Sequence, residues 1–169
     1  MPGYKGHIVG AVICNSAYAG ALAAVPHAID HSTQYLLTDI ELLVGLFVVA
    51  ILFGLFPDID TNSKGQHIFY LVALVADIWL IVDGRMVPAA FLGPLAMTPI
   101  VGKHRGWTHS KLAMFLVPSP IIILPYLYNK HLLAFALIIY GAALTGYFSH
   151  LLFDGCITKY VHIKGASRY

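Results

Sequence analysis

Charged residues are scarce in this chain. Lys, Arg, Asp and Glu together make up only 11 % of its 169 residues, whereas 59 % are hydrophobic. A typical soluble domain carries about 25 % charged residues and could not bury so large an apolar share. The composition therefore predicts one integral membrane domain that covers residues 1–169.

Cysteine and basic runs are also nearly absent. Cys14 and Cys156 are the only two cysteines and form no CxxC motif, so we expect neither a disulfide framework nor a thiolate zinc site. The net charge is only +2, and the basic residues do not form a long run. This distribution excludes a nucleic-acid partner from the interpretation.

Long apolar segments are what the sequence does contain. They lie at about 7–24, 41–56, 67–82, 87–101, 112–128 and 132–153. Their lengths are close to the ~20 residues with which a helix crosses a bilayer. We predict an all-α, polytopic bundle of about six transmembrane helices. The fourth segment carries three prolines, so it is expected to be kinked or re-entrant.

The cations predict which way the bundle faces. If all six segments cross, both termini and the loops near 57–66 and 102–111 share one side of the membrane. Most cations belong to that side: Lys5, Lys64, Lys103, Arg105, Lys111, Lys159, Lys164 and Arg168, against Arg85 and Lys130 on the other side. By the positive-inside rule, the side with the termini is cytoplasmic.

Histidines and aspartates gather at the same predicted boundary. They come from four separated parts of the chain: His7, then Asp58 and Asp60, then His104 and His109, and finally His150 and Asp154. Folding of the bundle would bring these four parts toward one layer. Ionisable groups near the bilayer are costly and are usually paired or functional, although any one of them alone could be an interfacial or capping residue.

Local spacing adds geometry to this group. His150 and Asp154 are four residues apart on a predicted helix, so their side chains share one face, as two ligands of one metal would. Pro57 is expected to end the preceding helix, which leaves Asp58 and Asp60 on turning or extended backbone, where one could bind the metal and the other bridge or accept a hydrogen bond. Thr108 is expected to be the N-cap of the next helix, with His109 in its first turn.

The residue types restrict the metal. Imidazoles and carboxylates without thiolates suit a divalent ion, zinc first and manganese or iron as alternatives. The group is larger than the four ligands of one zinc ion. Either two metals share bridging carboxylates, which we favour, or one metal has neighbours that orient its ligands. A further group, His27, Asp30 and His31, is interpreted as part of an amphipathic interfacial turn.

Four motifs carry a family likeness. GHIVG, FPDID, HRGWTHS and GYFSHLLFDG, in this order, resemble the predicted inner-membrane, metal-dependent hydrolases described as LexA-regulated or LexA-binding. The likeness runs from about Gly6 to Asp154. It implies a bacterial inner-membrane protein in which the seven histidines and aspartates bind metal, and it implies a reaction class without a substrate. One departure is Thr61, where a histidine often follows PDID in the family.

The expected function is therefore a membrane-embedded hydrolase. Metal-activated water would attack a phosphoester of a phospholipid or a lipid-linked substrate. Arg105 offers a fork for phosphate oxygens, and Asp58 or Asp60 could act as general base. The alternative is a non-catalytic, metal-stapled scaffold or regulatory partner. A metal-ion transporter is disfavoured, because the predicted ligands lie at one boundary and not along a path.

Overall fold

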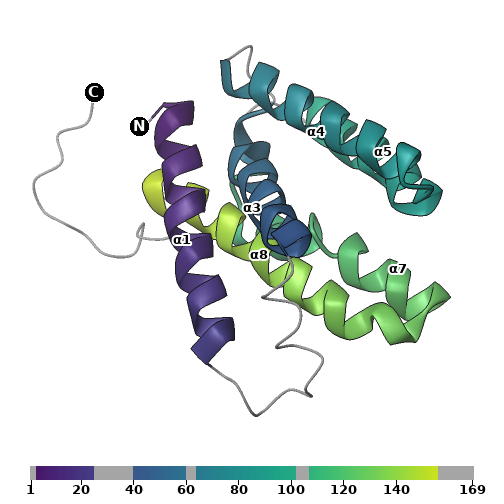
Figure 1. Ribbon diagram of the computed structural model, residues 1–169. Coiled ribbons are helices and arrows are strands. Elements are labelled where there is room, and N and C mark those ends of the chain that lie inside the picture. Colours follow the sequence, from purple (N-terminus) through teal and green to yellow (C-terminus); the bar gives the residue numbers. More distant parts are fainter. Residues whose placement is uncertain (1–2, 25–39, 60–63, 102–106, 156–169) are drawn as a thin grey trace, which may run out of the picture.

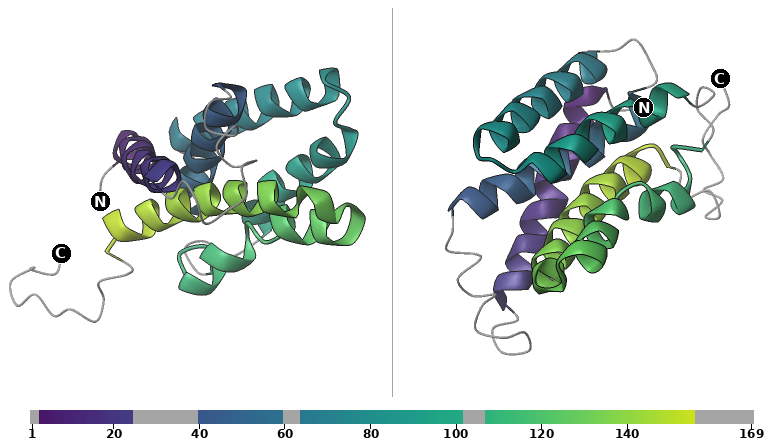
Figure 2. Two further views of the ribbon diagram at one scale, coloured as in Figure 1. Left: turned by 60° about the horizontal axis from the view of Figure 1, so that its bottom comes forward. Right: turned by 90° about the vertical axis from the view of Figure 1, so that its right-hand side faces the viewer.

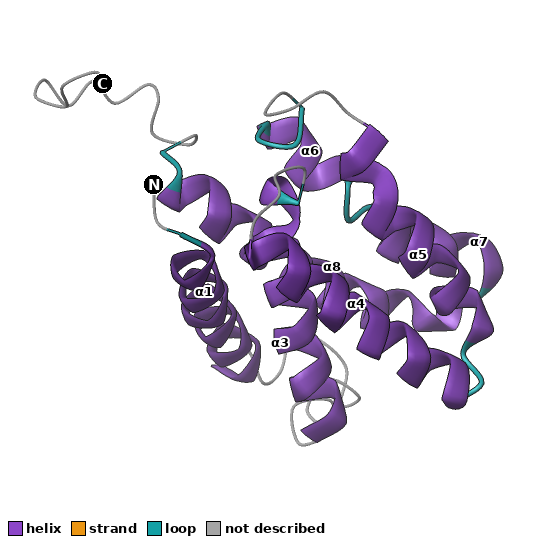
Figure 3. Cartoon of the chain, turned by 90° about the horizontal axis from the view of Figure 1, so that it is seen from above, coloured by secondary structure: helices purple, strands orange, loops and turns teal. Residues whose placement is uncertain are grey.

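The computed structural model describes residues 3–24, 40–59, 64–101 and 107–155. Its regular elements are α1 (Tyr4–Ala24), α3 (Ile40–Leu55), η1 (Phe56–Asp58), α4 (Lys64–Val82), α5 (Met86–Val101), α6 (Lys111–Leu116), α7 (Pro120–Tyr128), η2 (Lys130–Leu132) and α8 (Leu133–Phe153). Within these residues every regular element is helical, and none is a strand (Figure 3). The all-α prediction is confirmed.

Five stretches are long and apolar enough to cross a membrane: Tyr4–Ala24, Ile40–Asp58, Lys64–Val82, Lys111–Tyr128 and Lys130–Phe153. The fourth predicted segment corresponds to α5, which has 16 residues and is not one of these five stretches. At 1.5 Å per residue it is about 24 Å long, shorter than the ~30 Å hydrocarbon core. Its three prolines do not interrupt the helix, which is assigned without a break from Met86 to Val101.

The fifth predicted segment is broken in the structure. It forms α6 and then α7, with a turn at residues 117–119 between them. Pro118 and Pro120 explain the break, because proline has no backbone N–H to continue the helical hydrogen bonds. The hydroxyl of Ser119 donates to the carbonyl of Leu116 at 2.7 Å and satisfies one of the exposed carbonyls of α6.

Helices α1, α3 and α8 pack against one another (Figure 1). The α4–α5 pair lies beside α3, and α7 runs along α8 (Figure 2). Small residues allow α1, α3 and α8 to approach closely. A side chain added at Gly146 of α8 would overlap the backbone of Ala50 in α3, and one added at Gly54 would meet Ala11 in α1.

Chain direction brings four helix ends to one end of this bundle. The start of α1 and the ends of η1 and α8 meet there, as contacts of His7 with Asp58 and Asp154 show. The start of α4 joins them, because the Gln66 side-chain amide donates to the carbonyl of Ile59 at 2.9 Å. The described cations at this end are Lys5, Lys64 and Lys111, in agreement with the predicted cytoplasmic side.

Candidate metal centre

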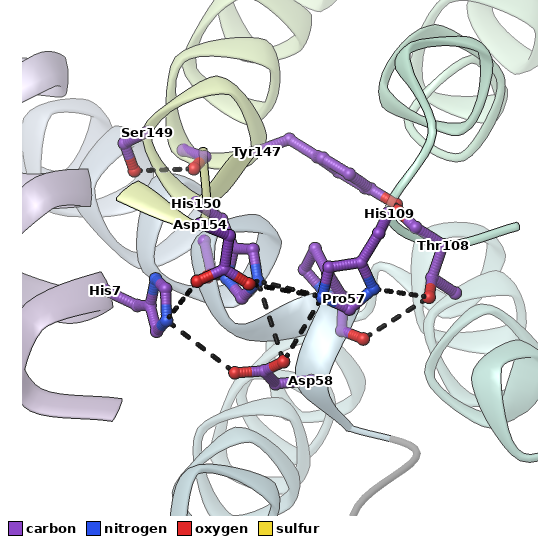
Figure 4. Close-up of polar contacts among 11 residues, drawn as sticks. His7, Pro57, Asp58, Thr108, His109, Tyr147, Ser149, His150 and Asp154 are labelled. Carbon is purple, nitrogen blue, oxygen red and sulfur yellow. Dashed lines mark hydrogen bonds and ion pairs between the residues drawn. The ribbon is translucent and has the colours of Figure 1, made fainter. Parts of the chain in front are cut away.

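Four side chains of ligand type converge at this end of the bundle. Asp58, His109, His150 and Asp154 each offer one ligand atom, and the four atoms all lie within 4.8 Å of one another (Figure 4). The residues come from η1, from the turn before α6, and from the end of α8. The central sequence prediction was convergence of distant segments, and for these described residues the structure shows it.

Helix α8 supplies two members of the group. His150 and Asp154 are one turn apart, and their Nε2 and Oδ2 atoms lie 3.4 Å from each other, as the sequence spacing predicted. The helix ends directly after them. Asp154 is the C-cap residue, and Gly155 follows with φ of 69°, a left-handed conformation that closes many helices. Both side chains are buried.

Asp58 comes from the end of α3, where the local prediction was partly wrong. Pro57 does not turn the chain away, because it occupies the first turn of the 3₁₀ helix η1, where the missing N–H is tolerated. The helical direction therefore continues as far as Asp58. Its side chain is 36 % exposed, which makes it the most accessible of the four ligand-type residues.

His109 precedes α6 and does not lie in its first turn. Ser110, and not Thr108, is the N-cap residue, since its Oγ accepts from the backbone N–H of Ala113 at 3.0 Å. Thr108 instead points its buried hydroxyl toward the carbonyl of Pro57, 3.4 Å away. The prediction of the cap was wrong by two residues. The imidazole of His109 still reaches the group, with Nε2 at 3.4 Å from Asp58 Oδ1.

The hydrogen bonds of His150 orient its ring toward the group. Its Nδ1 lies 2.8 Å from the carbonyl oxygen of Gly54. A carbonyl can only accept, so Nδ1 carries a proton and the neutral ring presents the lone pair of Nε2 on its other side. Metal-binding histidines commonly donate their second ring nitrogen to a backbone carbonyl in this way.

His109 has the same orientation. Its Nδ1 lies 3.3 Å from Thr108 Oγ1, and this hydroxyl gives its own proton to the carbonyl of Pro57. The hydroxyl therefore accepts from Nδ1 of His109, which leaves the lone pair on Nε2. The Nε2 atoms of His109 and His150 are 3.4 Å apart. Two lone pairs and two carboxylates that face one another need positive charge between them, which bound protons or a metal ion could supply.

The charge of Asp154 is consistent with this need. Hydrogen bonding with His150 holds the pKa of the Asp154 carboxyl below its ordinary value. That bond places a proton between the carboxylate and the ring nitrogen. A divalent ion in the same place would replace the proton and satisfy the same carboxylate.

The distances fit a small metal ion. Nε2 of His109 lies 3.4 Å from Asp58 Oδ1, 3.5 Å from Asp154 Oδ2 and 3.4 Å from His150 Nε2. Nε2 of His150 lies 3.7 Å from Asp58 Oδ1 and 3.4 Å from Asp154 Oδ2. Tetrahedral zinc with bonds of about 2.0 to 2.1 Å separates its ligand atoms by about 3.3 Å. The four residues could therefore hold zinc with little rearrangement.

His7 lies against the opposite side of the carboxylates. Its ring stacks on that of His150, with centroids 3.9 Å apart. Its Nε2 lies 3.7 Å from Oδ2 of Asp58 and 3.6 Å from Oδ1 of Asp154. Each carboxylate thus turns one oxygen to His109 and His150 and the other to His7. Such a pattern suits carboxylates that bridge two metals, and it equally suits one metal whose ligands His7 orients.

The structure brings together all five predicted ligands that it describes. These are His7, Asp58, His109, His150 and Asp154. Asp60, His104 and Arg105 lie outside the described residues, as do His27, Asp30 and His31. Sequence reasoning missed two orienting groups. The carbonyl of Gly54 has no sequence signal at all, and the hydroxyl of Thr108 was assigned to a cap.

The fold and the site together define a polytopic helical membrane protein with a histidine and aspartate group that could hold a metal ion. Residues 1–162 match the model of the YdjM inner membrane protein family, and the chain belongs to this family. Neither a curated protein nor a solved structure matches it. Membership confirms the predicted inner-membrane localisation. The metal dependence and hydrolysis implied by the four motifs stay predictions.

Proposed function

We propose that this protein is a membrane-embedded, metal-dependent hydrolase that works at the predicted cytoplasmic face. The observation that carries the proposal is the uneven exposure of the candidate metal centre. The side chains of His7, His150 and Asp154 are at most 3 % exposed, whereas His109 is 14 % and Asp58 is 36 % exposed. The group is sealed by α1 and α8 and is accessible beside η1, where water and a substrate could reach it.

Asp58, His109, His150 and Asp154 would hold the metal. Zinc is the first candidate, with manganese or iron as alternatives. A second ion would be bound by His7 and the remaining carboxylate oxygens. Bound metal would supply Lewis acidity, which polarises a phosphoryl oxygen and brings the pKa of bound water near 7. The buried residues keep the group dry and oriented on its inner side.

Asp58 is the residue placed to handle a proton. It is the accessible carboxylate of the group, and its Oδ1 and Oδ2 face different histidines. If it does not bind the metal through both oxygens, it could accept a proton from the attacking water as general base. Asp60, which follows in the same motif, is the alternative base.

The location of the group favours a lipid phosphoester as substrate. Asp58 ends the span Ile40–Asp58, and Asp154 directly follows the span Lys130–Phe153. The group therefore lies near the level of lipid headgroups. Lys111 begins α6 two residues after His109, and Lys103 and Arg105 precede it in the sequence. This positive charge suits the phosphate of a phospholipid or lipid-linked substrate, which would not have to leave the bilayer.

A second function has one specific observation in its favour. Four protein ligands suffice to fill a tetrahedral zinc site, so the metal could be a structural staple in a scaffold or regulatory partner. The exposure of Asp58 favours the enzyme, because a staple gains nothing from an accessible side. Transport is less well supported, since the described group lies at one end of the spans.

The first test measures metal content. Protein purified in detergent is analysed for bound elements, alongside the variants His109→Ala and Asp154→Ala. The matched control is His131→Ala, an exposed histidine of η2 at the opposite end of α8. We expect the two site variants to lose the metal and the control to keep it. Full metal content in both site variants would show that these residues are not the ligands.

The second test separates an enzyme from a staple. The same samples are assayed with phospholipids, a chromogenic phosphoester and a chromogenic carboxylic ester, before and after removal of metal with a chelator. Turnover that disappears with the metal and returns on its addition supports the proposal. A protein that binds stoichiometric metal and cleaves none of these compounds would support the scaffold instead.

A further inference from the structure

Tyr147 makes a buried hydrogen bond although it is not one of the candidate metal ligands. It lies on α8 three residues before His150, and it is fully buried among apolar side chains. Its hydroxyl donates to the backbone carbonyl of Thr108 at 2.5 Å (Figure 4). A hydroxyl is expensive to bury without a partner, so a phenylalanine would be the simpler choice for a purely apolar position.

Thr108, which accepts this hydrogen bond, connects two segments of the candidate metal centre. The hydroxyl of Thr108 donates to Pro57, the neighbour of Asp58, and accepts from Nδ1 of His109. The ring of Tyr147 also packs near that of Phe56, with centroids 6.1 Å apart. One side chain of α8 therefore contacts both the segment that carries Asp58 and the segment that carries His109.

We propose that Tyr147 is a positioning residue of the candidate metal centre. Its hydroxyl holds the Thr108–His109 segment against the helix that carries His150 and Asp154, and so sets the place of the His109 imidazole. The need for such a tether follows from the local structure. His109 precedes a helix of only six residues, α6, which cannot hold the segment in place by itself. The inference rests on the metal site of the proposed function.

The chain offers a closely matched control. Tyr140 lies on the same helix, two turns earlier, and its hydroxyl donates to the carbonyl of Phe115 in α6 at 3.1 Å. Tyr140→Phe therefore removes the same kind of bond between α8 and the segment 107–116, but at a distance from the ligands. Tyr147→Phe removes the bond to Thr108 and keeps the ring that packs on Phe56.

The test compares the metal affinity of the two variants. Zinc is titrated into metal-free protein against a chromophoric chelator, and the absorption spectrum of the cobalt-loaded protein reports the coordination geometry. Loss of residues that orient metal ligands typically weakens binding by about 10- to 100-fold. We expect a loss of about 10-fold or more and an altered cobalt spectrum for Tyr147→Phe. Tyr140→Phe is expected to match the wild type in both.

A second measurement does not depend on the metal. Hydrogen–deuterium exchange of the backbone at residues 107–110 is recorded in metal-free wild type and in both variants. Faster exchange in Tyr147→Phe alone supports the tether, whereas equal exchange in all three proteins overturns it. A wild type that binds no metal would refute the proposed metal site, and the exchange result would still decide whether Tyr147 positions His109.

Discussion

Nδ1 of His150 lies 2.8 Å from the carbonyl oxygen of Gly54, a bond that joins the last turn of α8 to the last turn of α3. The same imidazole presents Nε2 to Asp58 and Asp154. One ring therefore has two separable tasks. Nδ1 secures the packing of two helices, and Nε2 serves the candidate metal centre.

His150→Asn should separate these tasks. The amide of asparagine can donate a hydrogen bond at a position close to that of Nδ1, but it has no atom that reaches the place of Nε2. We expect loss of bound metal together with a small loss of stability. His150→Ala removes both functions and should cost about 1 to 3 kcal/mol more, since it also breaks a buried hydrogen bond. Thermal unfolding of metal-free protein in detergent checks the difference.

Equal stability of His150→Asn and His150→Ala would show that the bond to Gly54 contributes nothing. The comparison uses metal-free samples because bound metal itself raises apparent stability. Elemental analysis of the same preparations shows whether both variants have lost the ion.

The hydroxyl of Thr108 is expected to matter through His109. Thr108→Val keeps the shape of the side chain and removes the group that accepts from Nδ1, so the imidazole loses its fixed orientation. We expect the metal affinity of this variant to fall by about 10-fold or more, as is usual when a group that orients a metal ligand is lost. Thr108→Ser keeps the hydroxyl and should bind metal nearly as well as the wild type. If valine and serine give the same affinity in the chelator titration, the proposed orientation of His109 is wrong.

Gly146 is predicted to be the least tolerant glycine of α8. A Cβ atom there would overlap the backbone of Ala50, and backbone atoms cannot move aside as a flexible side chain can. We expect Gly146→Ala to destabilise the protein by about 1 to 3 kcal/mol, the usual range for overpacking. The shift of α8 against α3 should also weaken metal binding, because these helices carry His150 and lead to Asp58.

Gly45→Ala is the control for this substitution. Gly45 lies inside α3, and an added Cβ would have no heavy atom within 4 Å. Replacement of a helical glycine by alanine should then leave stability unchanged or raise it by about 0.5 to 1 kcal/mol. Thermal unfolding of the two variants in the same detergent decides the point. Similar stability of both would show that α3 and α8 are packed less closely at Gly146 than the structure indicates.

Much of the fold could be predicted from the sequence because membrane spans obey a strong rule. Apolar runs of the right length must form helices, since backbone polar groups in lipid have no other partners. The site could be predicted for a related reason. Consecutive spans run in alternating directions, so helix ends that are distant in sequence share one layer, and His7 meets Asp154 there.

The helix caps and hydrogen-bond partners near the site were less predictable, because several neighbouring groups could make the same bond. Thr108 and Ser110 are both good caps, and only tertiary contact decides between them. The carbonyl of Pro57 engages Thr108, which leaves Ser110 to cap α6. The turn at Pro57 was misjudged because proline is tolerated in the first turn of a helix. The carbonyl of Gly54 could not be found at all, since every residue has a carbonyl.

Acid should release the metal through the histidines and not through Asp154. Metal binds the neutral imidazole, whose ordinary pKa is about 6.5, so protons compete with the ion as pH falls below that value. The pKa of Asp154 is lowered, so this carboxylate remains ionised until the pH is below its ordinary range. Between about pH 6 and pH 5, only the imidazoles therefore exchange metal for protons.

The slope of apparent metal affinity against pH shows how many histidines bind the metal. Each ligand imidazole should weaken apparent affinity by about 10-fold per pH unit once the pH is below its pKa. Two ligand imidazoles therefore give a slope of about two decades per pH unit, and a third ligand imidazole gives about three. His7→Gln should then reduce the slope in an equilibrium dialysis series. An unchanged slope in this variant would mean that His7 only orients the carboxylates, and that one metal, not two, occupies the site.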